Sequence, residues 1–153
     1  MFRTSTGSAK RTSLAAAGCA AALAMGLSLA AAAPAAATDA NGRYTAKEIR
    51  TFLNGFYGEH GPSAKDRKHK VSDVLKQRAA ENPEVDVLLC AQNQPQSIDI
   101  GKVTTAQSAR VGWASVTTHW GENGEDTAVF TAYVDLDGKQ PLKLLDVDCS
   151  AGS

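Results

Sequence analysis

The pattern of apolar and polar residues is most regular in the C-terminal third of the chain. In residues 126–136 apolar side chains occupy every second position, and most positions between them are polar or aromatic. A period of two is the signature of a β-strand that buries one face. The positions predicted to be buried are Ala128, Phe130, Ala132, Val134 and Leu136.

The neighbouring residues complete an antiparallel sheet. Residues 110–120 also alternate, and the glycine-rich segment 121–125 predicts a hairpin turn between the two strands. Asp137 and Gly138 predict a second turn into a strand at 142–149, and alternation around Ile98 predicts a first strand at 98–103. A four-stranded meander with one apolar face needs a covering layer, so helices are expected upstream.

The first predicted helix begins with a capping box. Thr45 is followed three residues later by Glu48, the spacing at which each side chain can bond the other residue's amide. An apolar stripe with a period of three to four residues follows, and Gly58 ends it. The stripe consists of Ile49, Phe52, Leu53, Phe56 and Tyr57.

A second helix is predicted at 72–81, where Ser72 is the cap. Between the two helices, residues 65–70 form a basic run, which is either a solvated face or a docking patch for an acidic partner. Residues 85–89 fit a short helical turn better than a strand, because Asn82 and Pro83 resemble a new helix start. The inward-facing residues of this region are expected to be Val71, Val74, Leu75 and Ala79.

Helices followed by antiparallel strands define an α+β fold. Three stretches resemble the nuclear-transport-factor-2-like superfamily, also called cystatin-like, and in particular its small exported bacterial domains of unknown function. They are Phe52 to Tyr57 in the capped helix, 89–95 and 144–149. The resemblance implies N-terminal helices packed on a curved four-stranded antiparallel sheet, a cone or roll spanning residues 44–150.

The resemblance also implies where a pocket would lie, between the first helix and the concave face of the sheet. It implies no activity, because one fold of this kind supports isomerases, hydrolases, dehydratases and pure binding domains. The expected lining residues are Phe52, Phe56, Tyr57, Trp113 and Phe130.

Enzymes of this superfamily place an acid–base pair in the pocket, often Asp with Tyr or His. Tyr57, Asp99, Trp113, His119 and Tyr133 are the residues that alternation could turn inward. The ordinary interpretation is structural: Tyr57 continues an apolar stripe, His119 lies beside a turn, and Asp99 faces away from its isoleucine neighbours. No catalytic residue is therefore assigned. The sequence does not decide whether the chain is an enzyme, although it favours a protein without catalytic activity.

The N-terminus has the features of a signal peptide. A basic head with Arg3, Lys10 and Arg11 precedes an apolar run at 14–33, and small residues then predict cleavage after Ala37. The alternative is a lipoprotein anchored at Cys19. The predicted organisation is a signal peptide at 1–37, a flexible segment at 38–43 and one domain at 44–150.

Cleavage would change the charge and leave two cysteines. Removing the three basic residues of the leader leaves 13 Lys and Arg against 16 Asp and Glu, a net charge of −3. A mildly acidic domain is a poor match for nucleic acid or for an anionic membrane. In an exported chain, Cys90 and Cys149 predict a disulfide that stabilises the end of the last strand.

No metal or cofactor site is predicted. His60, His69 and His119 lack a paired ligand spacing, and Asp135 to Gly138 lacks the distal ligands of a calcium loop. The sequence thus predicts a secreted binding domain for a small ligand or a protein partner. The alternatives are a pocket enzyme of the same fold and an inhibitor or immunity-type protein with an exposed patch near 120–125.

Overall fold

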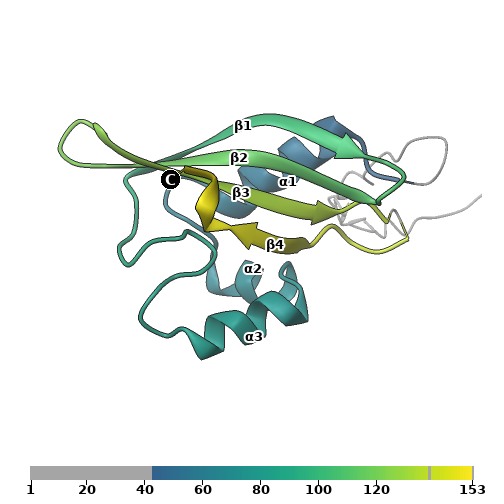
Figure 1. Cartoon of the computed structure of the whole chain (residues 1–153), viewed down its shortest axis with the longest axis horizontal. Coiled ribbons are helices and arrows are strands. Elements are labelled where there is room, and N and C mark those ends of the chain that lie inside the picture. Colours follow the sequence, from purple (N-terminus) through teal and green to yellow (C-terminus); the bar gives the residue numbers. More distant parts are fainter. Residues whose placement is uncertain (1–42, 138, 153) are drawn as a thin grey trace, which may run out of the picture. The chain divides into compact units, whose positions relative to one another are not determined.

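The computed structural model describes residues 43–137 and 139–152. The described chain forms three α-helices, then four strands and a short 3-10 helix, which confirms the α+β class (Figure 1). The predicted leader, with its cleavage position after Ala37 and the alternative anchor Cys19, lies outside the described residues. The elements are α1 (Ala46–Tyr57), α2 (Ala64–His69), α3 (Asp73–Glu81), β1 (Ser97–Ala106), β2 (Val111–Trp120), β3 (Asp126–Asp135), β4 (Leu144–Asp148) and η1 (Cys149–Gly152).

The predicted capping box starts α1. The Thr45 amide donates to Glu48 Oε2 at 2.7 Å, and the Glu48 amide donates to Thr45 Oγ1 at 3.4 Å. The helix ends at Gly58, whose φ of 54° lies in the left-handed region that glycine adopts without steric cost. Both boundaries of α1 therefore follow from local sequence signals.

Helix α2 was not predicted, because it has no apolar face. None of its residues is buried, so hydrophobic periodicity could not identify it. Its start is set by Ser63, whose hydroxyl accepts from the Asp66 amide at 3.1 Å. Lys70 lies 2.8 Å from Asp66, and hydrogen bonds from Lys70 and Ser63 lower the pKa of Asp66.

Helix α3 has the predicted Ser72 cap, but one predicted contact is wrong. Leu75 is buried, whereas Val74 is 71 % exposed, because consecutive residues of a helix point about 100° apart. The short helix expected at 85–89 is also absent: Val85 lies in a bend, Asp86 forms an isolated antiparallel bridge with Ala91, and residues 87–90 form the turn between them. Asp86 accepts from the Leu88 amide and its own amide donates to Ala91, so local bonds replace a helix here.

The sheet is an antiparallel meander in the order β1-β2-β3-β4, as predicted. Its register places Ala114 opposite Ala132 and Val116 opposite Phe130. The pairing shifts between Ile100 and Val103 in β1 and again between Tyr133 and Val134 in β3. Such irregularities re-aim side chains and increase strand twist locally.

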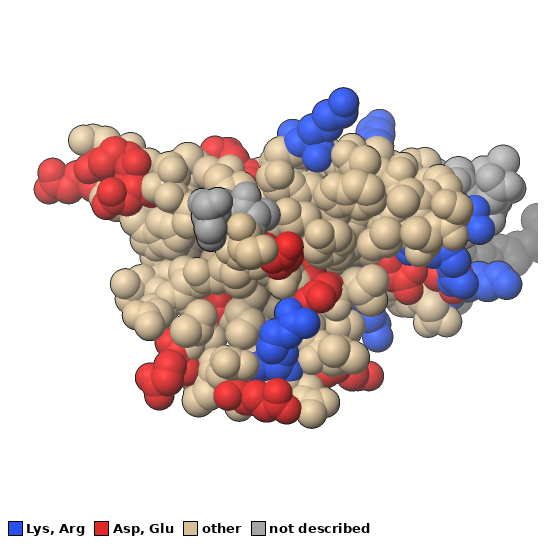
Figure 2. All heavy atoms as spheres, in the orientation of Figure 1, with Lys and Arg blue, Asp and Glu red and all other residues tan. Residues whose placement is uncertain are grey.

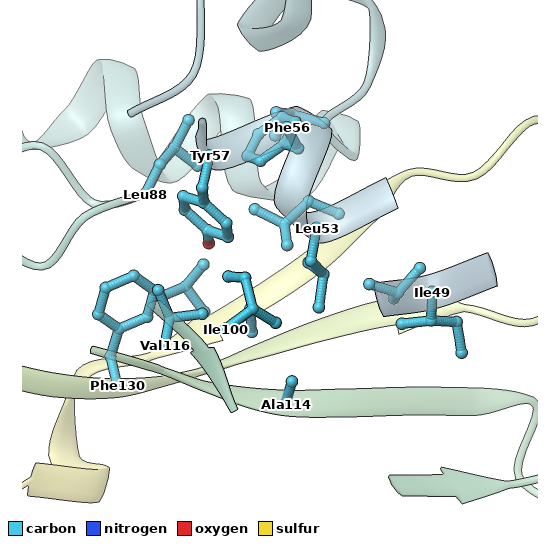
Figure 3. Packing of buried hydrophobic residues seen from close by; sticks show 14 of the residues in the cluster. Ile49, Leu53, Phe56, Tyr57, Leu88, Ile100, Ala114, Val116 and Phe130 are labelled. Atoms are coloured by element: carbon cyan, nitrogen blue, oxygen red, sulfur yellow. The ribbon is translucent and has the colours of Figure 1, made fainter. Parts of the chain in front are cut away.

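The core lies between α1 and one face of the sheet, which we call the inner face (Figure 3). Phe56, Phe130 and Val134 are buried in one cluster, and Phe52 packs against it while partly exposed. This confirms that the helix stripe and the alternating strand share one core. The largest fully buried side chains of α1 are Tyr57, Phe56, Ile49 and Leu53.

The predicted cysteine pair is joined. Cys90 and Cys149 form a disulfide with a Cα–Cα distance of 5.5 Å, although they are 59 residues apart in sequence. The bond connects the segment before β1 to the start of η1, directly after the last strand. It therefore fixes a chain end that would otherwise be free to fray.

Candidate functional site

Four of the five residues expected to line a pocket lie together, but they fill the space rather than surround it. Ring centroids are 5.0 Å apart for Phe56 and Tyr57 and 5.7 Å apart for Tyr57 and Phe130. Phe52 stacks on Phe56 at 5.7 Å. Four cavities of the described residues, with volumes from about 320 to 910 Å³, are lined by none of these side chains.

Trp113, the fifth residue, lies on the opposite face of the sheet, which we call the outer face. Its neighbours Gly112 and Ala114 point inward and are buried, so alternation turns the indole outward. There it pairs with Tyr133 of β3, with ring centroids 6.4 Å apart. Asp99 and His119 also lie outside the core, and His119 Nε2 is 3.0 Å from Asp99 Oδ2.

Tyr57 is the only acid–base candidate that points into the core. Its side chain is completely buried and its hydroxyl has no hydrogen-bond partner among the described residues. Burial, and to a smaller extent the nearby Asp86 carboxylate, raises the pKa of this phenol. Tyr57 is therefore neutral at physiological pH and exposes no surface that a substrate could reach.

Each edge strand of the sheet is covered along part of its length. Along β4, the Leu144 amide donates to Lys70 at 2.7 Å and the Ser72 amide donates to Leu144 at 2.8 Å. Along β1, the Arg50 guanidinium donates to the carbonyls of Ile100 and Gly101 at 3.0 and 2.6 Å. Covered edges of this kind oppose the addition of another strand.

The outer face carries an open groove of about 910 Å³ beside α3. In Figure 1, α1 lies behind the sheet, and of the described elements only η1 crosses in front of β3. Val74 from α3 and Leu145 from β4 line the groove and are 71 % and 41 % exposed. Among the described residues only three large apolar side chains are exposed, so the groove holds two of the three.

Three charged side chains, Arg78, Asp146 and Asp148, line the groove. Arg78 Nη1 is 2.6 Å from Asp146 Oδ1 and also donates to the Val147 carbonyl at 3.2 Å. Asp148 accepts hydrogen bonds from the side chain and the backbone amide of Ser150, and these bonds lower the pKa of Asp148. Figure 2 shows acidic and basic side chains meeting over β4 and α3, next to a largely uncharged sheet face.

The basic run at 65–70 is partly neutralised within the domain. Arg67 forms two hydrogen bonds with Asp86, at 3.0 and 2.5 Å, and Lys70 pairs with Asp66. The Arg67–Asp86 pair also lines a smaller cavity of about 320 Å³ with His60. Since these charges satisfy one another, the pair is explained by its role in joining α2 to the turns before β1.

The β2–β3 hairpin has a different character. Glu122, Glu125 and Asp126 cluster at its tip, which appears as the acidic group at the upper left of Figure 2. Trp120 and Asp126 line a shallow cavity with the loop at 91–93. This is the patch expected for the inhibitor or immunity-type alternative, but an acidic cluster alone identifies no partner.

The described residues contain no group of three or more His, Cys, Asp or Glu able to hold a metal ion. Across the same residues, no helix is long and apolar enough to cross a membrane. The class that this fold and site define is an α+β domain with a filled interior and an open groove. No family model matches the chain, and no curated protein or solved structure matches it either.

Sequence reasoning missed the groove for two reasons. It placed Val74 in the core, and it treated Leu145 only as part of a strand. The outward direction of Trp113 was available from the alternation in 110–120, where Ala114 and Val116 mark the buried positions. The groove itself depends on the position of α3 beside β4, for which local sequence carries no signal.

Proposed function

We propose that this protein is a non-enzymatic binding domain whose ligand occupies the groove between α3, β4 and the outer face of the sheet. The observation that carries the proposal is the contrast between the two faces. Phe56, Tyr57 and Phe130 fill the interior, whereas Val74 and Leu145 remain exposed in a groove of about 910 Å³. Open, mainly apolar concavities with a few polar groups are the usual binding sites of proteins.

The proposal disfavours an enzyme that uses a pocket inside the cone. Such an enzyme needs an acid–base group that touches its substrate, and the phenol of Tyr57 is completely buried. Asp99 and His119 form a pair on the outer face of the sheet, outside the interior, but the Asp99 side chain is mostly exposed. The ligand is therefore a small molecule or a protein segment that is bound and released unchanged.

Membership of the nuclear-transport-factor-2-like, or cystatin-like, superfamily is part of the same proposal. The order of elements supports it, because a capped amphipathic helix comes first and a four-stranded antiparallel meander comes last. The position of α1 across one sheet face supports it as well. A cone or roll of this kind hosts many functions, so this membership adds no activity.

Export from the cell is also proposed. The basic head, the apolar run and the small residues before Thr38 support a cleaved leader. The Cys90–Cys149 disulfide is compatible with an oxidising compartment. N-terminal sequencing of the protein recovered from the medium is expected to begin at Thr38, and a lipid-modified chain beginning at Cys19 would contradict this part.

The chemistry of the groove restricts its partners. Asp146 and Asp148 place carboxylates in the groove, and a single guanidinium, Arg78, opposes them. Phosphate-rich ligands would be repelled there, so nucleic acid and anionic membranes are poor candidates. An uncharged ligand or a cationic one fits this balance of charges.

A fragment screen by NMR tests the proposed function. Small uncharged and cationic fragments are expected to shift the amide signals of residues lining the groove, including Val74, Tyr133 and Leu145. Val74→Lys or Leu145→Lys should abolish these shifts by placing a charge on the apolar wall. Val85→Lys is the matched control, because Val85 is the third exposed apolar side chain and lies outside the groove.

The control variant is expected to bind the same fragments as the unmodified protein. If the fragments instead shift the signals of Tyr57 and Phe130, the ligand enters the interior and the proposal is wrong. Fragment binding that persists in both groove variants would also contradict it. Turnover of a bound fragment would favour the enzyme alternative.

A further inference from the structure

We propose that the ligand of the groove is an uncharged glycan chain that stacks on Tyr133, which lines the groove, and extends onto Trp113, which is paired with Tyr133 and lies next to the lining. This inference rests on the proposed binding function and adds the class of ligand. It depends on how strand register arranges side chains on the outer face. No other aromatic pair among the described residues lies outside the core.

Strand pairing places the two rings in the middle of a row that crosses the sheet. Thr104 pairs with Trp113, Trp113 with Tyr133, and Tyr133 with Asp146, so one residue from each strand contributes. A second row next to it contains Ser115, Thr131 and Asp148. Because directly paired residues of neighbouring strands project to the same face of a sheet, all of these side chains face outward.

The chemistry of these rows matches that of a sugar. A pyranose ring presents an apolar C–H face that packs on aromatic rings, and a rim of hydroxyls that donate and accept hydrogen bonds. Trp113 and Tyr133 are half-buried, with centroids 6.4 Å apart, and offer ring surface together with an N–H and an O–H. The hydrogen bonds of the described residues include none from either group, so both are available to a ligand.

Hydroxyls at the edge of the sugar would find charged partners. Asp146, Asp148 and Arg78 lie along the same groove as Tyr133. Carboxylates and guanidinium groups make hydrogen bonds about twice as strong as neutral groups do. The two carboxylates oppose an anionic polysaccharide, so the inference is restricted to uncharged chains.

Binding of a peptide by strand addition is less favoured by the same structure. An extended peptide that binds in this way needs a free sheet edge. Here Arg50 occupies carbonyls of the β1 edge, and residues 70–72 pair with β4. A glycan needs no free edge, since it binds to side chains on the face.

The proposed binding surface, which consists of the groove and the neighbouring Trp113, is also held in a fixed shape. Trp113 and Tyr133 stand on directly paired positions of two ten-residue strands. The groove residues Cys149 and Ser150 are fixed by the disulfide to Cys90. A site that is already formed loses little conformational entropy when the ligand binds.

Titration of the full domain with defined oligosaccharides tests this inference. The probes are cellohexaose and N-acetylchitohexaose, which are uncharged, and hexagalacturonate as the anionic counterpart. Isothermal titration calorimetry gives affinities, and NMR follows the two indole N–H signals. At least one uncharged probe is expected to bind and to shift the Trp113 signal, whereas hexagalacturonate is expected not to bind.

The matched variants are Trp113→Ala and Trp120→Ala, in the same strand. Trp113→Ala is expected to weaken binding about tenfold or more, as loss of an aromatic stacking platform does. Trp120 lines a different cavity, so Trp120→Ala should keep the affinity of the unmodified protein. Circular dichroism confirms folding, and Trp113→Phe, which keeps a ring, should restore most of the lost affinity.

Two results would overturn the inference: neither uncharged probe binds, or Trp113→Ala binds as well as the unmodified protein does. If fragments still shift the signals of Val74 and Leu145 in either case, the proposed binding function stands and only the glycan class fails. If the groove responds to no fragment and no oligosaccharide, the proposed function fails as well. Binding of a peptide alone would assign the groove to a protein partner.

Discussion

Replacing Tyr57 with Phe removes one oxygen atom from the centre of the core and leaves the ring in place. The Tyr57 hydroxyl is fully buried and has no hydrogen-bond partner among the described residues. Burying an unpaired polar group costs about 1–3 kcal/mol. Tyr57→Phe is therefore expected to raise the free energy of unfolding by about 1 kcal/mol at pH 8, after the loss of some packing contacts.

The difference in the free energy of unfolding between Tyr57→Phe and the unmodified protein should grow at alkaline pH. In the unfolded chain Tyr57 ionises near pH 10, whereas burial raises the pKa of the folded phenol well above that value. Ionisation of Tyr57 in the unfolded chain therefore has no effect on stability well below pH 10, and it increasingly favours unfolding as the pH rises above 10. At pH 11 the unmodified protein should have lost about 1.4 kcal/mol that Tyr57→Phe keeps.

Urea unfolding followed by circular dichroism at pH 8 and pH 11 measures both effects. Tyr133→Phe is the control at pH 8, because Tyr133 lies half-exposed on the outer face and should change stability by less than about 0.5 kcal/mol. A loss of more than about 1 kcal/mol in Tyr57→Phe at pH 8 would show that the hydroxyl is hydrogen-bonded. A stability difference that stays constant between the two pH values would refute the pKa argument.

Three further predictions concern stability and association. Phe130→Ala should lower the free energy of unfolding by about 3–5 kcal/mol, and Phe52→Ala by less because Phe52 is only partly buried; equal effects in urea unfolding would contradict this. The double replacement of Cys90 and Cys149 by Ala should cost about 4 kcal/mol, because the bond closes a loop with a separation of 59 residues; a loss below about 1 kcal/mol would contradict the chain-entropy argument. Arg50→Ala should uncover carbonyls of the β1 edge and promote self-association in sedimentation experiments, whereas Arg50→Lys should stay closer to the unmodified protein.

The fold was predictable from the sequence wherever local signals and burial agree. The Thr45 capping box, the stripe through Phe56 and the alternation around Phe130 each identified an element and its buried face. The disulfide was predictable because two cysteines remain after the predicted cleavage and export favours their oxidation. Each of these features is specified by residues close together in sequence or by composition.

Features without an apolar pattern were not predictable in this way. Helix α2 buries none of its residues, and its start is marked only by a bond from the Asp66 amide to Ser63. The segment around Asp86 looked like a helix start, but bonds to Arg67 and to the Leu88 amide determine its conformation. Of these bonds, only the one between Arg67 and Asp86 joins residues that are far apart in sequence.

The predicted site differs more from the structure than the predicted fold does. Phe52, Phe56, Tyr57 and Phe130 were grouped correctly, yet as packed core rather than as a lining. Trp113 was placed with them, although its alternation with Ala114 indicates the other face. A groove is made by the distance between elements, and hydrophobic periodicity carries no information about that distance.

The interior of the domain is filled, and an open groove lies on the outer face of the sheet. A crystal structure with soaked organic probes tests both of these features in one experiment. Crystals of the domain would be soaked in 2-propanol and in dioxane, small molecules that enter any accessible apolar cavity. Both probes are expected to cluster against Val74, Leu145 and Tyr133. Probe density between α1 and the sheet, against Tyr57 and Phe130, would contradict this expectation and return the site to the interior of the fold.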